Sequence, residues 1–147
     1  MIKFKPIEHD VRQFFPDLRK KLEGEESVCF AYLFGSYGRG KPGPLSDVDV
    51  AVFLEGCKDY WDKKLELIGE ITRTLRTEEV DLVILNQAPL SLRFHVIKTG
   101  ELLFSKDEFK RIEFEAKTFK FYCDTLPLRE LAWKSLTNRI EEGRFGY

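Results

Sequence analysis

Residues 28–54 read VCFAYLFGSYGRGKPGPLSDVDVAVFL. The two ends of this stretch, Val28–Phe34 and Val48–Leu54, are short apolar runs rich in β-branched and aromatic residues, which favours buried β-strands. Between them, Gly35 to Pro44 forms a dense cluster of glycine and proline and predicts a loop. The stretch therefore predicts a strand, a loop and a second strand.

The loop imitates two phosphate-binding motifs without satisfying either. Residues 35–41 have the glycine and lysine spacing of a P-loop, but Pro42 stands where a Ser or Thr must bind magnesium. Residues 38–43 match the letters of the dinucleotide-binding fingerprint, yet Pro42 and Pro44 argue against the helix that must begin at the third glycine. Both readings are excluded.

Two aspartates stand at the entry of the second strand. Side chains alternate between the two faces of a strand, so Asp47 and Asp49 should project to one face while Val48, Val50 and Val52 face the other. Two neighbouring carboxylates repel, but they are tolerated where they bind a divalent cation, and their oxygens suit Mg²⁺. An EF-hand is excluded because no third acid and glycine follow at the required positions. The pair therefore predicts a magnesium site.

A third carboxylate, Asp81, opens the next predicted strand, Val80–Leu85. If the two strands are neighbours, Asp81 lies beside the pair. Such an assembly suits phosphoryl or nucleotidyl transfer, with a Gly-Ser loop holding a triphosphate through backbone N–H groups and a hydroxyl. Each part alone has a plain structural reading: Asp-x-Asp is common on exposed strands, Gly35-Ser36 is a turn, and Asp81 is a solvated strand end. Their combination is far more specific.

The rest of the chain predicts helices around these strands. Apolar residues at three- and four-residue steps predict an amphipathic helix over Asp59–Thr77, between the second and third strands. Similar spacing predicts a helix from Val11 to Leu22, with a start or kink at Pro16. The remaining predictions are a helix from Pro89 to about Lys98 capped by Gly100, a short edge strand Glu101–Phe104, a helix from Lys106 onward and a last helix Leu128–Ile140.

The helix after Lys106 carries more apolar surface than one small sheet needs. Its stripe consists of Phe109, Ile112, Ala116, Phe119 and Cys123, and Phe114 and Phe121 widen it. Two readings stay open: the helix covers the domain's own core, or part of it meets a partner chain.

Composition limits the classes of function. The chain has 147 residues, which predicts one domain, and 24 basic residues balance 25 acidic ones. That balance gives no overall field to attract DNA or an anionic membrane, so we expect no direct nucleic-acid binding. The apolar runs are too short to span a bilayer, and the N-terminus lacks the pattern of a signal peptide. The three cysteines are widely spaced, which fits reduced thiols in the cytoplasm.

The combined motif resembles the DNA-polymerase-beta-like nucleotidyltransferases. Their signature is Gly-Ser, ten residues and Asp-x-Asp, with a third Asp on a later strand, and this chain has Gly35-Ser36, Asp47-x-Asp49 and Asp81 in that order. Within this superfamily, the short length, Gly38-Arg39-Gly40 and residues 81–104 look like the minimal (MNT) antitoxins of HEPN/MNT toxin-antitoxin pairs. The resemblance implies an α/β fold with a small mixed β-sheet flanked by helices.

The resemblance also implies roles for individual residues. Asp47 and Asp49 would be metal ligands, and Asp81 the third ligand and the group that activates the incoming hydroxyl. ATP would be held by Gly35, Ser36 and Arg39. The implied cofactor is Mg²⁺ at two sites, with ATP as substrate.

The implied reaction is transfer of AMP to a tyrosine of a cognate HEPN ribonuclease toxin, which silences it. Two alternatives stay open: an antitoxin that acts by stoichiometric binding alone, and an enzyme that modifies a small molecule of the aminoglycoside type. We expect a single nucleotidyltransferase domain over residues 1–147. Its core covers about residues 25–105, and its C-terminal helical segment, residues 106–147, is a candidate partner surface.

Overall fold

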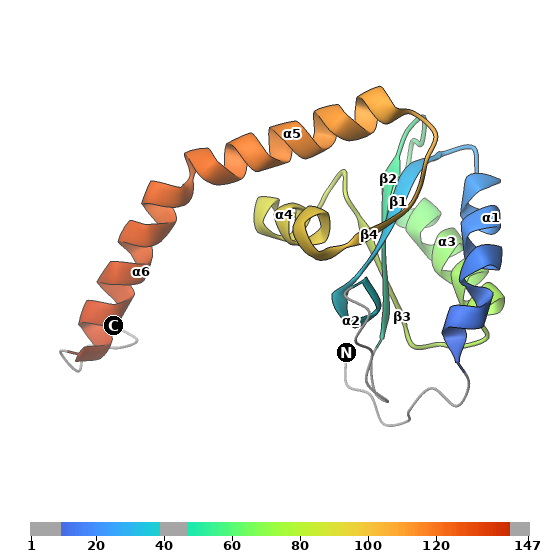
Figure 1. Ribbon diagram of the computed structural model, residues 1–147, viewed down its shortest axis with the longest axis horizontal. Coiled ribbons are helices and arrows are strands. Elements are labelled where there is room, and N and C mark those ends of the chain that lie inside the picture. Colours follow the sequence, from blue (N-terminus) through green and yellow to red (C-terminus); the bar gives the residue numbers. More distant parts are fainter. Residues whose placement is uncertain (1–9, 39–46, 142–147) are drawn as a thin grey trace.

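The computed structural model describes residues 10–38 and 47–141. Its centre is a four-stranded sheet in the order β3-β2-β1-β4 (Figure 1). β1 pairs antiparallel with β2 and β4, whereas β2 and β3 are parallel, so the sheet is mixed as predicted. The strands are β1 (Val28–Phe34), β2 (Val48–Leu54), β3 (Val80–Ile84) and β4 (Glu101–Ser105).

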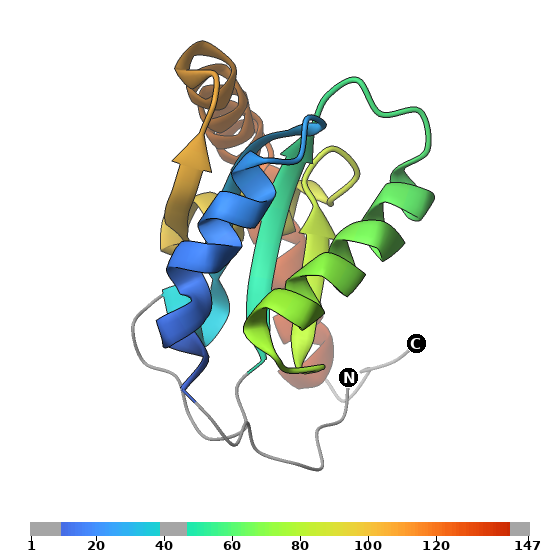
Figure 2. The same ribbon diagram turned by 90° about the vertical axis from the view of Figure 1, so that its right-hand side faces the viewer.

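Two helices cover one face of the sheet with aliphatic side chains. They are α1 (Phe15–Glu23), which follows the short 3₁₀ helix η1 (Val11–Phe14), and α3 (Tyr60–Leu75). Figure 2 shows both helices in front of the sheet, with β4 and β3 at its two sides. The helices contribute buried leucine and isoleucine, and the strands contribute valines that face them. This face is the larger part of the hydrophobic core: Leu18, Leu22, Leu67, Ile71, Leu75, Val48, Val50 and Val52.

The opposite face is covered by α4 (Leu90–Thr99) and α5 (Glu108–Asp124) and is aromatic. Phe30 stacks on Phe53 with ring centroids 4.8 Å apart, and Phe114 of α5 packs against both rings. Tyr32 donates a hydrogen bond of 2.6 Å to Glu115, which also pairs with Arg111. These contacts fix α5 on β1.

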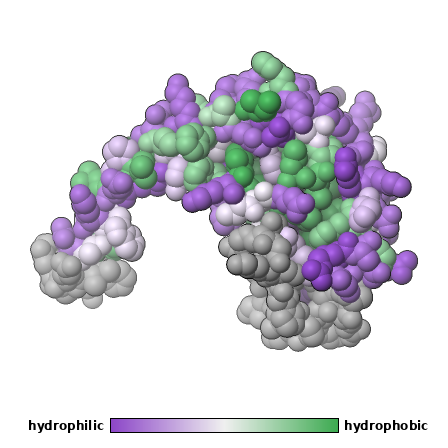
Figure 3. All heavy atoms as spheres, viewed as in Figure 1, coloured by the Kyte–Doolittle hydropathy of each residue, from purple (hydrophilic) through white to green (hydrophobic). Residues whose placement is uncertain are grey.

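The last helix, α6 (Leu126–Glu141), extends away from the body as an arm (Figures 1 and 3). Its direction is set at the α5–α6 junction, where Arg129 lies 3.5 Å over the ring of Tyr122 and donates to the Tyr122 carbonyl. Tyr122 in turn stacks on Phe94 of α4, with centroids 3.7 Å apart. The arm is therefore held at its base by a stack that spans α4, α5 and α6.

The structure corrects two sequence predictions. The start of the predicted loop is a short helix, α2 (Gly35–Gly38), while residues 39–46 lie outside the described part. The last helix begins at Leu126 rather than Leu128, because Pro127 is tolerated in a first helical turn. For the helix after Lys106 the two readings are not exclusive. α5 covers the core through Phe114 and Thr118, whereas the residues of the stripe are exposed: Phe109, Ile112, Ala116, Phe119 and Cys123.

Within the described residues, no helix combines the length and the hydrophobicity needed to span a bilayer.

Candidate functional site

Asp49 lies on the central strand β2, on the face covered by α4 and α5. In the sheet register it stands beside Phe34 of β1 on one side and beside Asp81 of β3 on the other. Because directly paired residues of neighbouring strands project to the same face, Asp49 and Asp81 share a face. Asp47 precedes β2 by one residue and lies two positions before Asp49. The strands β2 and β3 are therefore neighbours, as the prediction for Asp81 required.

Gly35 packs directly against Asp49. It follows the last residue of β1 and has a φ of +67°, a conformation that L side chains rarely adopt. A Cβ built on Gly35 would overlap Oδ2 of Asp49 and lie 3.2 Å from its Cγ. The glycine thus leaves room for the Asp49 carboxylate where β1 ends and α2 begins. This explains why the Gly-Ser motif needs a glycine at its first position.

The α2 helix is anchored through Tyr37. Its ring meets Phe15 of α1 edge-on at a centroid distance of 5.8 Å, and burial raises the pKa of the Tyr37 hydroxyl. The backbone of Ser36 lies between Gly35 and Tyr37 in this helix, while the side chain of Ser36 and the whole of Arg39 fall outside the described residues. Their contacts with ATP remain predictions.

Asp81 is exposed and lines a groove of about 280 Å³ at the edge of the sheet. The groove runs along β3 and is bordered by Lys64 of α3 and Leu92 of α4. The full lining is Lys64, Asp81, Leu82, Val83, Ile84, Gln87, Ala88 and Leu92. A carboxylate in an open groove is accessible to a substrate.

The donor set is suited to Mg²⁺, which binds through one or two protein carboxylates and completes its shell with water and phosphate. Within residues 10–38 and 47–141, no three His, Cys, Asp or Glu side chains are close enough to hold a metal ion by themselves. Asp49 and Asp81 share a face of the sheet, and Asp47 lies just before β2, so their carboxylates are the groups in this region that could bind Mg²⁺.

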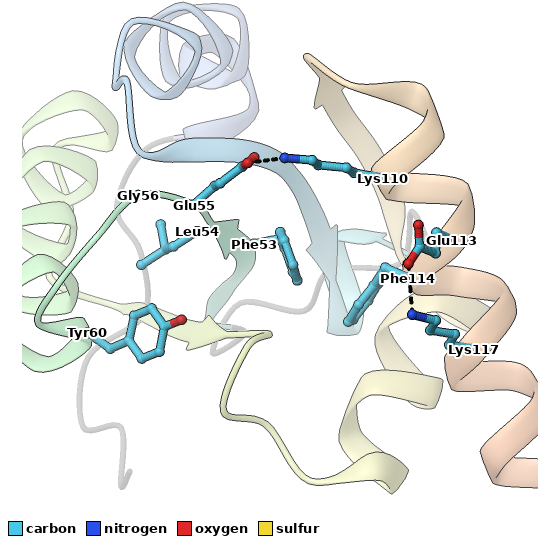
Figure 4. Close-up of a pocket in the computed structure, with 9 residues that line it drawn as sticks. All are labelled: Phe53, Leu54, Glu55, Gly56, Tyr60, Lys110, Glu113, Phe114 and Lys117. Atoms are coloured by element: carbon cyan, nitrogen blue, oxygen red, sulfur yellow. Dashed lines mark hydrogen bonds and ion pairs between the residues drawn. The ribbon is translucent and has the colours of Figure 1, made fainter.

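A larger cavity of about 500 Å³ lies at the other end of β2 (Figure 4). Phe53, Tyr60 and Phe114 supply its aromatic surface, and two ion pairs, Lys110–Glu55 and Lys117–Glu113, stand at its rim. None of the predicted site residues within the described part of the chain lines it. No pattern in the sequence pointed to this cavity, because its walls come from three separate segments.

An aromatic contact connects α4 to the end of β1. His95 of α4 meets Phe34 edge-on at a centroid distance of 6.4 Å, and Phe34 is the register neighbour of Asp49. The α4 helix thus reaches the region in which β1 ends and α2 begins.

Comparisons with known proteins agree with this geometry. A family model for the polymerase beta nucleotidyltransferases matches residues 17–109. A crystal structure of a toxin-antitoxin complex with AMP-PNP contains a chain that is 26% identical, with a TM-score of 0.68, covering 85% of this chain and 97% of that one. No curated protein matches significantly.

Two further solved structures share the fold at lower identity. One is the toxin-antitoxin complex MntA-HepT, at 24% identity and a TM-score of 0.66, covering 86% of this chain and 98% of that one. The other is tri-AMPylated HEPN toxin from Shewanella oneidensis in complex with MNT antitoxin, at 24% identity and a TM-score of 0.67, covering 87% of this chain and 99% of that one.

Proposed function

Because the chain belongs to the polymerase beta nucleotidyltransferase family, we propose that it is an antitoxin that transfers AMP from Mg²⁺-ATP to a tyrosine of a cognate HEPN ribonuclease toxin in the cytoplasm. The observation that carries this proposal is the shared face of Asp49 and Asp81, with Gly35 packed against Asp49. The similar chain solved in a toxin-antitoxin complex with AMP-PNP supports it.

In this proposal Asp47 and Asp49 hold Mg²⁺, with Asp81 as the third ligand. When bound, two Mg²⁺ ions would neutralise the triphosphate and stabilise the attacking and leaving oxygens. Gly35, Ser36 and Arg39 hold the triphosphate. Of these three residues, Gly35 packs against Asp49 in the structure.

The proposed chemistry is one displacement at the α-phosphorus of ATP. The tyrosine oxygen forms a bond to that phosphorus, the bond to the bridging oxygen breaks, and pyrophosphate leaves with the electron pair. The tyrosine proton passes to the carboxylate of Asp81, which is exposed and therefore accessible to an incoming hydroxyl. Asp81 is the base and Asp49 the metal ligand on the central strand.

The exposed side of α5, together with the α6 arm, is the surface that we propose to meet the toxin. Most of the large hydrophobic side chains that are exposed in the described residues belong to these two helices, including Phe109 at 76% exposure and Trp133 at 68%. This much exposed apolar surface, on a helix that extends away from the body and on the outer side of its neighbour, is typical of a surface that binds a partner. A protein acceptor therefore fits the arm better than a small-molecule acceptor does.

The test is to incubate the purified chain with its HEPN partner, ATP and Mg²⁺ and to measure the mass of the partner by mass spectrometry. Nucleotidyl transfer adds roughly 329 Da for each AMP. An unchanged mass, with the ribonuclease activity still neutralised, would mean that the chain acts by binding alone. Transfer to an aminoglycoside but not to the toxin would assign it to the small-molecule enzymes.

A further inference from the structure

We infer that the acceptor tyrosine reaches the site within an extended segment of the partner that adds to the outer edge of β3 as a further strand. This inference rests on the proposed function and names how the acceptor binds. It is carried by three features of β3: its place at the sheet edge, the direction of its peptide groups and the position of Asp81.

The first feature is the open edge. β3 is the terminal strand of the order β3-β2-β1-β4, and among the described residues no strand pairs with its outer side. The groove of about 280 Å³ is lined by four consecutive strand residues, from Asp81 to Ile84, so it follows the backbone. A cavity that follows a strand edge fits an extended chain better than a compact ligand.

The second feature is the direction of the peptide groups. The carbonyl of Glu79 accepts from the Val48 N–H at 2.9 Å, and the Leu85 N–H donates to the Val52 carbonyl at 2.9 Å. The odd-numbered residues of this segment therefore point their peptide groups at β2. Alternation along the strand turns the N–H and C=O of Leu82 outward, together with the N–H of Ile84. These groups give an added strand its backbone partners.

The turn after β3 leaves this edge accessible. The Ile84 carbonyl, which also points outward, is already used, since it accepts from the Gln87 N–H at 3.1 Å. The added strand should therefore pair with the Asp81 end of β3 rather than with its last residue. That end is the one beside the candidate active site.

The third feature is the position of Asp81 itself. In a sheet, residues opposite each other on neighbouring strands project to the same face, with Cβ atoms about 4.5–5.5 Å apart. A tyrosine at the position opposite Asp81 on the added strand would project to the face that carries Asp49. The strand would therefore place the tyrosine side chain beside the carboxylate that is proposed to take the proton.

The opposite edge of the sheet provides a built-in control. β4 is also an edge strand, and a groove of about 550 Å³ beside it is lined in part by Glu101, Leu102 and Leu103. Both β1 and β2 lie between that edge and Asp81. Strand addition at β4 would not bring a tyrosine to the site.

The first experiment fills each groove with one bulky side chain and measures AMP transfer to the whole HEPN toxin. We expect Ala88→Trp to raise the KM for the toxin at least tenfold, while leaving the Kd for Mg²⁺-ATP and the melting temperature unchanged. Leu102→Trp at the β4 edge should change none of these. An unchanged KM in Ala88→Trp would overturn the inference.

The second experiment addresses the backbone directly. Replacing the peptide N–H of Leu82 by an ester oxygen removes one outward donor, and we expect the KM for the toxin to rise about five- to tenfold, the equivalent of one hydrogen bond. The same replacement at Val83, whose N–H points at β2, should lower the melting temperature without raising that KM. Equal effects at the two positions would contradict strand addition.

The outcomes separate the inference from the proposed function. If the wild-type chain transfers AMP and the Leu82 ester variant does so with the same KM for the toxin, strand addition at β3 is refuted and the proposed function still stands. No wild-type transfer at all would refute the function and, with it, an acceptor at β3. Slower hydrogen exchange of the Leu82 N–H on raising the concentration of this chain alone would assign the edge to a second copy, which would also overturn the inference.

Discussion

The two faces of β2 differ in what they bury. On the face toward α1 and α3, the residues of Val48–Leu54 are aliphatic and fully or almost fully buried. On the face toward α4 and α5 the same strand carries Asp49, then Ala51 and then Phe53, with Asp47 just before it. The second face is therefore polar at the end where β2 begins and aromatic at the other.

This difference separates stability from chemistry along a single strand. The aliphatic face gains free energy from removing apolar surface from water, and it contains no group that could react. The acidic end of the other face does not stabilise the fold by burial, because neighbouring carboxylates repel each other. The presence of these aspartates therefore needs an explanation other than stability. Substitutions on the two faces should consequently affect different measurements, and their effects on the free energy of unfolding should decrease from the aliphatic face to the acidic end.

The largest effect is expected on the aliphatic face. Ile71 of α3 is fully buried there, and Ile71→Ala should lower the free energy of unfolding by about 2–5 kcal/mol through lost burial and a cavity. Leu65→Ala on the same helix, at a side chain that is 52% exposed, should stay within about 0.5 kcal/mol. Urea denaturation measures both. AMP transfer per folded molecule should be unchanged in each, and its loss in Ile71→Ala would contradict the separation of the faces.

The second-largest loss of stability is expected at Gly35, where a substitution would both strain the backbone and displace the Asp49 carboxylate. Gly35→Ala should cost about 1–3 kcal/mol, because the residue has a positive φ and its new Cβ would overlap the Asp49 carboxylate. Gly56→Ala is the matched control: Gly56 also has a positive φ, at +73°, but among the described residues no atom outside Gly56 and its two chain neighbours lies within 4 Å of the position that its new Cβ would take.

The melting temperature and the rate of AMP transfer are measured for Gly35→Ala and Gly56→Ala and compared with those of the wild-type chain. Only Gly35→Ala should lose transfer, whereas both should lose stability. Equal transfer in the two would mean that the contact between Gly35 and Asp49 has no part in the site.

A smaller effect is expected at the aromatic end of the second face. Tyr32→Phe removes the hydrogen bond to Glu115 and should cost about 1 kcal/mol. Burial, followed by the hydrogen bond to Glu115, raises the pKa of Tyr32, so the folded state keeps this proton at a pH where the unfolded chain has lost it. The contribution of Tyr32 is thus complete below about pH 10 and is lost as the pH rises further.

Chemical denaturation at several pH values checks this prediction. The wild-type chain should lose stability more steeply above about pH 10 than Tyr32→Phe does. Tyr122→Phe, which also removes a phenolic hydroxyl but keeps the ring that stacks on Phe94, serves as the control. The same alkaline slope in wild type and Tyr32→Phe would contradict the assigned pKa shift.

The smallest effect on stability belongs to the acidic end. Asp81 is exposed, so Asp81→Asn should change the free energy of unfolding by no more than about 0.5 kcal/mol. It should nevertheless lower AMP transfer by about 10²–10⁴-fold if Asp81 takes the tyrosine proton. Glu79→Gln, one residue before β3, is the control and should keep transfer. A large fall in melting temperature in Asp81→Asn would instead make this carboxylate structural.

Local patterns in the sequence were sufficient to predict most elements of the sheet. The runs at Val28 and Val48 are confirmed as strands with the predicted bounds, and the run at Val80 ends one residue early. The helical spacing after Asp59 is confirmed as well, with Asp59 capping the helix by accepting from the Trp61 N–H. These elements depend on periodicity and capping, which neighbouring residues determine.

The features that sequence reasoning missed depend on long-range packing. The outward direction of Phe109 and Phe119 follows from how Phe114 packs on Phe30, which helical spacing alone does not reveal. The arm owes its direction to Phe94, which is far from Tyr122 in the chain. The shared face of Asp49 and Asp81 was predictable, because one strand pairing brings the two residues together, whereas the groove along β3 depends on the strand order.

The acidic end of the second face is proposed to bind Mg²⁺-ATP and to contribute nothing essential to the fold. Calorimetric titration of Mg²⁺-ATP into the wild-type chain and into the double variant Asp47→Asn, Asp49→Asn tests both halves of this proposal, with the melting temperature of each recorded on the same samples. We expect the heat of binding to disappear in the double variant while its melting temperature is unchanged or higher. Unchanged binding in the double variant would contradict the proposed site.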